Sequence, residues 1–429
     1  MFCQKSEIRQ KAFDLLLDNR REGYSHRLKR DYSYTCPSPK RYPFQWFWDS
    51  CFHAIVLSHY DLEWAKKELL SLVSVQEENG FCPHVIFWRG IKLRKNLAWV
   101  FLQGKQFLFP LYTGLIQPPV LAFSALRVVE KDGDLGFLKE ILPKIKKYYL
   151  WLLENRDPDD DKLVSIVSPF ESGLDYKPAY DSALRLKEPT WFGLSWATRR
   201  VDFKNLLLRY NLKRIFRYGS FNVEDVLVNS ILARGLWTLS KLCLKNKEKE
   251  ESEKFGKLAE EVEKAILTKC LSEDGLFYDL YSRKEIQAKV KTFTTLLPLF
   301  LKTIDKKTVD SLVKNHLLNP AEFWLPYPVP SVAKNEPTFS PEEGPIWRGP
   351  TWLNINWFLV QGLVDHGWKE VAEEIVEKSC YLIQKSGFRE YYNPLTGEGY
   401  GAEGFGWSTL IVDMIELVGD GKGKKVDSD

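Results

Sequence analysis

Two acidic residues, Asp175 and Glu390, each lie in a stretch rich in aromatic side chains. Asp175 belongs to PFESGLDYKPAYD (169–181), where the prolines and the Ser-Gly pair predict a bent loop. Aromatic neighbours keep water from a carboxyl group, which raises its pKa and lets it stay protonated near neutral pH. Glu390 belongs to GFREYYNPLTGEG (387–399), where Asn-Pro and Thr-Gly mark turns. Such a pair suits hydrolysis of a glycosidic bond, because one group protonates the leaving oxygen and the other activates water.

Two further loops combine aromatic with polar residues. Residues 41–53 (RYPFQWFWDSCFH) place Trp48 and Asp49 at the expected start of a helix, where free backbone N–H groups favour a carboxylate. Residues 80–90 (GFCPHVIFWRG) carry His84. The simpler interpretation is structural, with Asp49 as a helix N-cap, Trp48 in the core and His84 as a hydrogen-bonded interior residue. A lone Trp-Asp pair or a lone His does not indicate catalysis by itself.

The composition indicates a large folded core and a sugar-binding surface. The chain has 429 residues, of which 44% are hydrophobic and 14% aromatic, with 15 tryptophans that can stack on sugar rings as well as fill a core. The net charge is +4, and Lys and Glu are mixed along the chain. A nucleic-acid ligand would require a basic face, so we expect none. The many Lys and Glu residues and the two Met residues point to a thermophilic host.

The seven cysteines are scattered and show no spacing typical of metal ligands. We therefore expect reduced thiols, no metal and no cofactor. Three charged residues lie among the first ten, where a signal peptide needs an apolar run, and no uncharged run reaches the ~18 apolar residues of a membrane span. These features predict a soluble cytoplasmic protein that does not bind a membrane.

Helical periodicity dominates the chain, and no run of alternating strands stands out. One helix is expected to open within 41–53 and run to about residue 60, and others are expected at 5–20, 61–78, 117–131, 135–155, 222–244, 250–270, 292–302, 306–316, 350–364, 367–386 and 403–418, with loops at 22–45 and 318–349. An apolar helix such as 350–364, which has Pro350 in its first turn, is followed by an amphipathic one such as 367–386. Six pairs of inner and outer helices closed into a ring make an all-α (α/α)6 toroid. An open solenoid would show a fixed repeat length, which is absent. We expect one domain over residues 1–429, with insertions at 85–114 and 176–220 over the mouth.

Several motifs resemble glycoside hydrolase family 63, in particular its short prokaryotic members similar to mannosylglycerate and glucosylglycerate hydrolases. They are QWFWDSCFHA (45–54), GFCPH (80–84), ESGLD (171–175), WRGPTWLNINW (347–357) and EYYNPLTGEG (390–399). The resemblance implies an (α/α)6 barrel, inversion of configuration and no metal in catalysis. It assigns the general acid to Asp175 and the base to Glu390. Residues expected near the sugar are Tyr42, Trp48, Asp49, His84, Gln117, Arg348, Gly349 and Trp407, with Tyr391 on the aglycone side.

The substrate expected from this resemblance is a small α-glucoside or α-mannoside, with glucosylglycerate and mannosylglycerate as candidates. A basic passage at 198–221 supplies cations for an acidic aglycone. Most of its charges are expected to face solvent, but Arg217 and Tyr218 precede an expected helix start, where a guanidinium can hold a carboxylate. Lys177 is an unusual added cation beside the acid.

Three alternatives remain open from the sequence. An α-glucosidase could act on neutral disaccharides or oligosaccharides of the trehalose, kojibiose or nigerose type. A sugar epimerase on a related barrel would use paired bases, for which His53 and His84 are the candidates in the loops described. A noncatalytic sugar-binding protein would not need two opposed acids. The sequence also leaves a homo-oligomer open.

Overall fold

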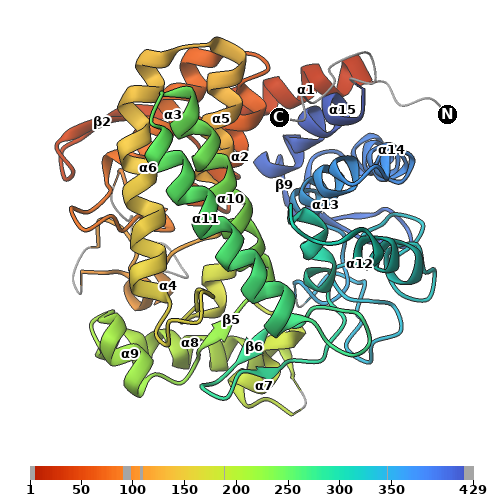
Figure 1. Ribbon diagram of the computed structural model, residues 1–429. Helices are drawn as coiled ribbons and strands as arrows, with labels where there is room; N and C mark the ends of the chain where they lie inside the picture. Colours follow the sequence, from red (N-terminus) through yellow and green to blue (C-terminus); the bar gives the residue numbers. More distant parts are fainter. Residues whose placement is uncertain (1–4, 90–97, 107–109, 188, 345, 420–429) are drawn as a thin grey trace.

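The computed structural model describes residues 5–89, 98–106, 110–187, 189–344 and 346–419. Helices dominate this part of the chain (Figure 1). The α-helices are α1 (Lys5–Asn19), α2 (Phe47–Leu57), α3 (Leu62–Ser74), α4 (Ala98–Gln103), α5 (Leu121–Asp132), α6 (Leu135–Arg156), α7 (Asp181–Leu184), α8 (Trp191–Leu207), α9 (Leu212–Tyr218), α10 (Val226–Lys245), α11 (Lys249–Ala265), α12 (Lys306–Ser311), α13 (Leu353–Asp365), α14 (Lys369–Ser386) and α15 (Ile411–Gly419). Shorter helices are η1 (Pro169–Ser172), η2 (Pro178–Tyr180), η3 (Ile266–Cys270), η4 (Phe293–Phe300), η5 (Leu312–Leu317) and η6 (Gly406–Leu410).

Six helical segments contact one another in a closed ring. In order around the ring they are α2, α5, α10, η4, α13 and the continuous pair η6 and α15, which returns to α2. Four of them are accompanied by an outer helix, because α3 packs on α2, α6 on α5, α11 on α10 and α14 on α13. The two terminal helices of the described chain, α1 and α15, also touch. This arrangement confirms the predicted (α/α)6 toroid.

Burial separates the inner from the outer helices. All residues of α2 from Phe47 to Leu57 are buried, whereas α11 buries one stripe that includes Phe255 and Val262 and exposes its charged face. Asp61 caps α3 by accepting a hydrogen bond from the Trp64 N–H at 2.9 Å. No helix in the described ranges is long and apolar enough to cross a membrane.

Four small antiparallel sheets interrupt the helices. Strands β1 (Arg20–Ser25) and β2 (Arg30–Thr35) form a hairpin, and β3 (Gln45–Trp46) pairs with β4 (Val85–Ile86). Strands β5 (Val223–Glu224), β6 (Leu280–Tyr281) and β7 (Ile286–Gln287) form a third sheet, and β8 (Arg389–Tyr392) with β9 (Gly399–Glu403) the fourth. The prediction of loops over 22–45 and 387–399 was therefore wrong in part. Pro350 was also misplaced, because α13 begins only at Leu353 and Thr351 is bridged to Tyr392.

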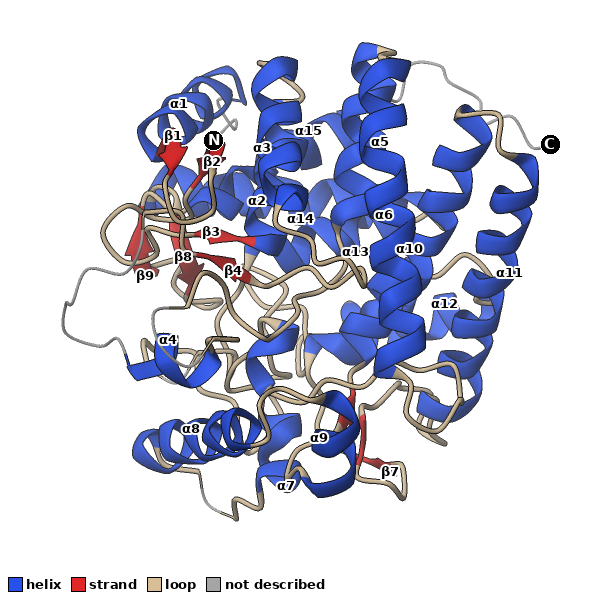
Figure 2. Cartoon of the chain, turned by 90° about the vertical axis from the view of Figure 1, so that its left-hand side faces the viewer, coloured by secondary structure: helices blue, strands red, loops and turns tan. Residues whose placement is uncertain are grey.

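The segments predicted as insertions lie together on one side of the ring. Helices α4 and α8 contact each other, and Figure 2 shows them with α9 below the main group of helices. The segment 176–220, predicted as an insertion and given no helix, contains η2 and the helices α7, α8 and α9. Helix α8 was not predicted because its sequence lacks a clear apolar stripe on one face. Several of its large apolar side chains are exposed: Trp191, Phe192, Trp196, Phe203 and Leu207.

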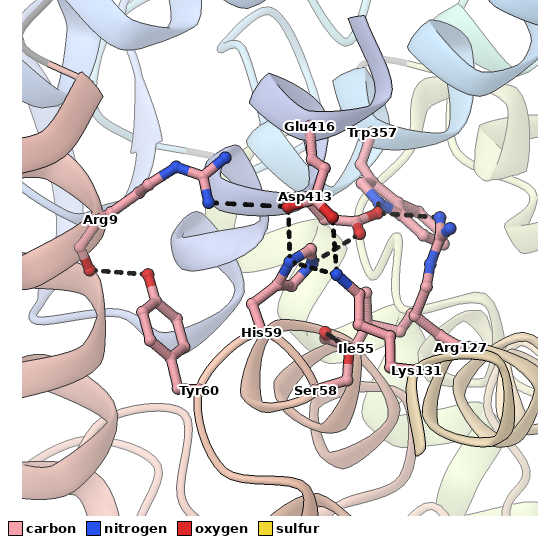
Figure 3. Close-up of polar contacts among 10 residues, drawn as sticks. All are labelled: Arg9, Ile55, Ser58, His59, Tyr60, Arg127, Lys131, Trp357, Asp413 and Glu416. Carbon is pink, nitrogen blue, oxygen red and sulfur yellow. Dashed lines mark hydrogen bonds and ion pairs between the residues drawn. The ribbon is translucent and has the colours of Figure 1, made fainter. Parts of the chain in front are cut away.

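A buried polar network joins the ring at the far end of α2 (Figure 3). The His59 imidazole lies 2.9 Å from Asp413 Oδ1 and 2.9 Å from Glu416 Oε2. Asp413 also accepts hydrogen bonds from Trp357 Nε1 at 2.8 Å and Arg127 Nη2 at 3.2 Å. These contacts tie the end of α2 to α5, α13 and α15.

Candidate active site

A cavity of about 270 Å³ opens at the N-terminal end of α2. Side chains from several helices, short strands and loops, including the loop 169–181, line it: Arg41, Tyr42, Trp46, Trp48, Asp49, His84, Trp99, Gln103, Gln117, Phe170, Asp175, Tyr176, Thr198, Arg199, Asp202, Trp347, Trp352, Glu390, Phe405 and Trp407. The four aromatic and acidic loops identified in the sequence therefore meet at one place.

The acid loop, residues 169–181, holds three carboxyl groups, and two of them are engaged elsewhere. Glu171 forms two hydrogen bonds with the Arg156 guanidinium at 2.6 and 2.8 Å. Asp181 pairs with Arg348 Nη2 at 2.5 Å. Among the described residues, no other side chain bonds the carboxyl group of Asp175, which faces the cavity. The fold thus leaves one of three carboxyl groups available for chemistry.

The loop can adopt this shape because residue 173 is glycine. Gly173 has a φ of +73°, and a Cβ atom there would lie 2.4 Å from the ring of Trp48. A side chain would therefore be strained by the backbone and would also collide with the indole. The glycine lets the acid loop pack directly on the start of α2, which brings Asp175 and Asp49 to the same cavity.

Burial raises the pKa of Asp175 well above its usual value, and the nearby negative charge of Glu390 raises it further. A hydrogen bond with the backbone opposes this shift only in part. Aromatic side chains such as Phe170 and Tyr176 supply the poorly solvated wall predicted from the sequence. Asp175 is therefore suited to carry a proton at neutral pH.

Glu390 is surrounded by groups that favour its charged form. Tyr42 donates its hydroxyl to Oε1 at 2.9 Å, the Ala402 N–H donates to Oε2 at 2.9 Å, and Arg41 Nη1 lies 3.3 Å from Oε2. Strands β8 and β9 carry Glu390 and Ala402, and Gly401 (φ +68°) leaves room for the carboxylate, because a Cβ there would lie 2.6 Å from Oε2. Burial raises the pKa of Glu390 above its usual value, although Arg41, the Ala402 N–H and Tyr42 oppose that effect. The two carboxyl groups thus share poor solvation but differ in their partners, because only Glu390 has a cation and hydrogen-bond donors that favour its charged form.

The polar residues at the start of α2 also face the cavity. Asp49 occupies the first turn of α2 rather than the N-cap position, and its Oδ1 atom is buried without a described partner. Gln117 Oε1 accepts the Trp48 N–H at 3.1 Å. His84 Nδ1 lies 2.6 Å from Thr113 Oγ1, and burial lowers the pKa of His84 to about 3, so its imidazole is neutral. The simple N-cap interpretation of Asp49 is wrong, and these groups can hydrogen-bond sugar hydroxyls.

Aromatic rings form the rest of the wall. Trp347 and Trp352 stack with their ring centres 3.6 Å apart, and Trp407 meets Trp48 edge to face at 5.6 Å. Trp407 Nε1 donates to the Glu390 backbone carbonyl at 3.0 Å, which connects η6 to β8. Flat rings with a fixed position are suited to contact the apolar faces of a sugar.

Eight of the residues predicted for the site line the cavity: Tyr42, Trp48, Asp49, His84, Gln117, Asp175, Glu390 and Trp407. Five do not. Arg348 pairs with Asp181, the Gly349 N–H donates to Ser331 Oγ, and Tyr391 stacks on Trp352 at 4.5 Å, so these three support the wall from behind. Arg217 and Tyr218 are exposed on α9 and contact each other, and Arg217 lines a separate surface hollow.

The predicted role of Arg217 in binding an acidic aglycone is therefore corrected. Residue 217 was expected before a helix, but it lies in the last turn of α9 and is not among the residues that line the cavity. Lys177, noted as a cation near the acid, is also directed elsewhere, because it is buried and pairs with Asp225 and with Asp279 at 2.7 Å. Neither side chain adds positive charge to the cavity wall.

Helix α8 contributes residues that sequence analysis did not select. Thr198, Arg199 and Asp202 lie within about one turn of α8 and line the cavity. Asp202 is held by Gln103 and Ser168, each at 2.7 Å, and burial raises the pKa of Asp202 to about 7. Arg199 makes no ion pair with a described residue and belongs to the basic passage identified in the sequence. Arg199 and Asp202 are three positions apart and so share one face of a helix, and this spacing could have identified Arg199 from the sequence.

Comparison with known proteins decides the family. The model of the mannosylglycerate hydrolase MGH1-like glycoside hydrolase domain matches residues 42–408. The chain belongs to this family. The prediction of a family 63 glycoside hydrolase is confirmed, and the protein is a glycoside hydrolase.

Relatives from this family resemble the chain over nearly all of its length. A mannosylglycerate hydrolase of Thermus thermophilus is 33% identical, over 88% of this chain and 95% of the relative. A glucosylglycerate hydrolase of Mycolicibacterium hassiacum is 26% identical, over 88% of this chain and 93% of the relative. The crystal structure of a GH63 mannosylglycerate hydrolase from Thermus thermophilus in complex with Tris and D-glycerate aligns with a TM-score of 0.82 at 31% identity, over 96% of this chain and 99% of that structure.

Proposed function

We propose that this glycoside hydrolase cleaves the α-glycosidic bond of a small glucoside or mannoside by a single displacement with inversion. One observation carries this proposal. Asp175 is an unpaired, poorly solvated carboxyl group, whereas Glu390 in the same cavity is a carboxylate held by Arg41, Tyr42 and a backbone N–H. Two carboxyl groups whose pKa values are set apart by their surroundings supply an acid and a base.

In the proposed reaction Asp175 donates its proton to the leaving glycosidic oxygen. Glu390 accepts a proton from a water molecule whose oxygen attacks the anomeric carbon from the opposite face. The bond to the aglycone breaks as the bond to water forms, and the two carboxyl groups end with exchanged protonation states. Asp49, His84 and Gln117 hold the sugar, and the tryptophan wall keeps bulk water away.

We further propose that the aglycone carries a carboxylate, with mannosylglycerate and glucosylglycerate as the first candidates. The names of the relatives motivate this choice, and one of them was crystallised with D-glycerate. Arg199 provides the chemistry in this chain, because it lines the cavity near Tyr176 and has no ion-pair partner among the described residues. A guanidinium can bind a carboxylate through two parallel hydrogen bonds.

Product analysis tests this function directly. The purified enzyme is given glucosylglycerate, mannosylglycerate, kojibiose, nigerose and trehalose, and proton NMR follows the fresh product. We expect the β-anomer to appear first and the glycosylglycerates to have the highest kcat/KM. Initial α-product would contradict inversion. Higher kcat/KM on a neutral disaccharide would contradict the acidic aglycone and favour the disaccharidase alternative.

The remaining predictions about partners stay open. A sugar epimerase with paired histidines is not supported, because His84 lines the cavity whereas His53 Nδ1 contacts the Thr35 carbonyl at 3.1 Å outside it. A homo-oligomer and a cytoplasmic location remain predictions.

A further inference from the structure

Lys177 lies two residues after Asp175 and is buried rather than exposed to solvent. Only 1% of the residue is exposed. Its ammonium group pairs with Asp225 Oδ2 and lies 2.7 Å from Asp279 Oδ2, and both of these acids are buried as well. A buried ammonium group needs such partners, because an isolated charge in the interior is costly. The side chain of Lys177 therefore has a fixed position in the fold.

The two acids are fixed at the start of α10, an inner helix of the ring. Asp225 is the N-cap residue of α10, and its Oδ1 atom accepts the Val228 N–H at 3.0 Å. Asp279, which directly precedes β6, accepts the Val226 N–H at 2.9 Å. Backbone N–H groups in the first turn of a helix stabilise a carboxylate and hold it in place. Lys177 is thus attached to the ring of helices.

A turn connects Lys177 to the catalytic carboxyl group. The Lys177 N–H donates to the Leu174 carbonyl at 2.9 Å. This bond closes a turn whose two central residues are Asp175 and Tyr176. The turn is also held at its start, because the Leu174 N–H donates to Ser172 Oγ at 3.1 Å. The position of Lys177 therefore sets the position of the backbone that carries Asp175.

Tyr180 adds a second connection between the acid loop and the same acids. Its buried hydroxyl donates to Asp225 Oδ2 at 2.5 Å and lies 2.7 Å from Ser172 Oγ. The Lys177 ammonium lies 4.6 Å from the centre of the Tyr180 ring. One carboxylate of α10 thus holds two residues of the acid loop that follow Asp175.

We propose that Lys177, held by Asp225 and Asp279, is a positioning residue that directs the carboxyl group of Asp175 at the leaving glycosidic oxygen. This inference rests on the proposed role of Asp175 as the proton donor. No described side chain bonds the carboxyl group of Asp175, so the turn that carries it must set its direction. Proton transfer needs the donor within about 2.6–3.2 Å of the oxygen, and a displacement of ~1 Å lowers turnover by up to ~10².

Two substrates that differ in their need for a proton donor test this role. One is the glycoside that the enzyme cleaves fastest, and the other is the α-glycosyl fluoride of the same sugar, because fluoride leaves with far less help from an acid than an alkoxide does. Lys177→Met should lower kcat on the glycoside at least ~10-fold and on the fluoride less than about threefold, with KM within about threefold on both. Lys187→Met is the matched control, because Lys187 is an exposed lysine outside the acid loop, and it should leave both rates within about twofold.

A double variant separates positioning from stability. Burial raises the pKa of Asp279, Lys177 opposes this shift, and the charge of Asp225 adds to it. Lys177→Met therefore leaves two buried acids without their cation, and its Tm should fall. Combining Lys177→Met with Asp279→Asn removes one of these charges, so Tm should rise again while kcat on the glycoside stays low. If the double variant regains both Tm and kcat, Lys177 only balances charge and the positioning role is wrong.

Asp175→Asn shows whether a failure concerns the positioning role or the proposed function. It should lose kcat on the glycoside and much less on the fluoride, because only the glycoside needs the proton. If Asp175→Asn loses kcat equally on both substrates, Asp175 is not the proton donor and the positioning role fails with it. If Asp175→Asn spares the fluoride but Lys177→Met lowers both rates equally, or neither, the positioning role alone is wrong.

Discussion

Near the two ends of helix α2 lie carboxyl groups whose pKa values are shifted in opposite directions. At its N-terminal end Asp175 and Asp49 face the cavity, and at the other end Asp413 meets His59, roughly 16 Å of helix away. Burial raises the pKa of Asp413 as it does that of Asp175, but Arg127, His59 and Trp357 lower it more, so that the pKa of Asp413 lies below its usual value. The pKa of Asp175 lies well above its usual value.

The contrast shows that the partners of a buried carboxyl group decide its role. Asp413 receives a hydrogen bond from an indole and contacts two basic side chains, as Figure 3 shows, and it joins four helices. Asp175 has no such side-chain partner among the described residues, so the desolvation of its charged form lowers the stability of the fold. A group kept in this state can donate a proton, whereas the paired group can only stabilise.

The largest expected effect is on catalysis. Asp175→Asn and Glu390→Gln should each lower kcat by at least ~10², because each removes one proton-transfer group. Steady-state kinetics on the preferred glycoside measures this, with circular dichroism to show that each variant is folded. Asp181→Asn is not a suitable control, since Asp181 holds Arg348; the exposed Asp160→Asn is. Near-normal kcat in folded Asp175→Asn would contradict the assignment.

The pH profile should identify which group is which. The raised pKa of Asp175 keeps it protonated at low pH, so activity should fall as pH rises and Asp175 loses its proton. At low pH activity should fall because Glu390 becomes protonated. Glu390→Gln should therefore lose the acidic limb of its residual activity and keep the alkaline limb. The opposite result would exchange the two roles.

The next effect concerns stability at the other end of α2. Asp413→Asn should lower the free energy of unfolding by about 3 kcal/mol at pH 7, because His59 and Arg127 lose their buried anion. Since the folded-state pKa of Asp413 is depressed, its contribution to stability is fully present above the unfolded pKa of about 3.9 and is lost as pH falls through the folded-state pKa. Chemical denaturation at pH 7 and pH 3.5 measures the difference. A tenfold loss of kcat with unchanged stability would show that the two ends are not separate.

The ring of helices could be predicted because its inner members are apolar on every side. Helices α2 and α13 show this pattern, and the charged faces of α11 and α14 mark the outer layer. The hairpin β1–β2 was missed because its strands are rich in charge and bury mainly Tyr32, Tyr34 and their polar neighbours on β2. Local sequence patterns therefore predict the ring of helices but not the small sheets attached to it.

The acid loop could also be found from its residue types, but the choice among its acids could not be proved. Glu171 and Asp181 differ from Asp175 in having Arg156 and Arg348 as partners, and those arginines lie elsewhere in the sequence. The choice of Arg217 over Arg199 failed for a related reason. Arg199 lines the cavity on helix α8, which packs against α4. No local sequence pattern records this long-range contact.

A smaller effect is expected for the aglycone. Arg199→Ala should lower kcat/KM on glycosylglycerates about 10- to 100-fold, since hydrogen bonds to a charged group are worth about 1.5–3 kcal/mol. It should have little effect on a neutral glucoside of similar size. Arg217→Ala is the matched control, because Arg217 is an exposed arginine outside the cavity. Equal losses on charged and neutral substrates would contradict a carboxylate-binding role for Arg199.

The smallest effect is a gain of stability in the inactive Asp175→Asn variant. Because the folded-state pKa of Asp175 is raised, its contribution to stability is fully present below the unfolded pKa and is lost as pH rises through the folded pKa. An amide does not ionise and escapes this loss. We therefore expect Asp175→Asn to be about 1 kcal/mol more stable to unfolding than the unmodified enzyme at pH 8, an estimate kept small because the side chain is open to the cavity.

This gain should vanish near pH 3.5, where the carboxyl group of the unmodified enzyme is largely protonated in both states. Thermal unfolding at pH 3.5 and pH 8 measures both differences, and Asp413→Asn provides the matched variant of opposite sign. The Tm difference should thus be positive for Asp175→Asn and negative for Asp413→Asn at pH 8, with both becoming smaller in acid. If Asp175→Asn were the less stable protein at pH 8, the carboxylate of Asp175 would have a stabilising partner, and its role as the proton donor would lose its physical basis.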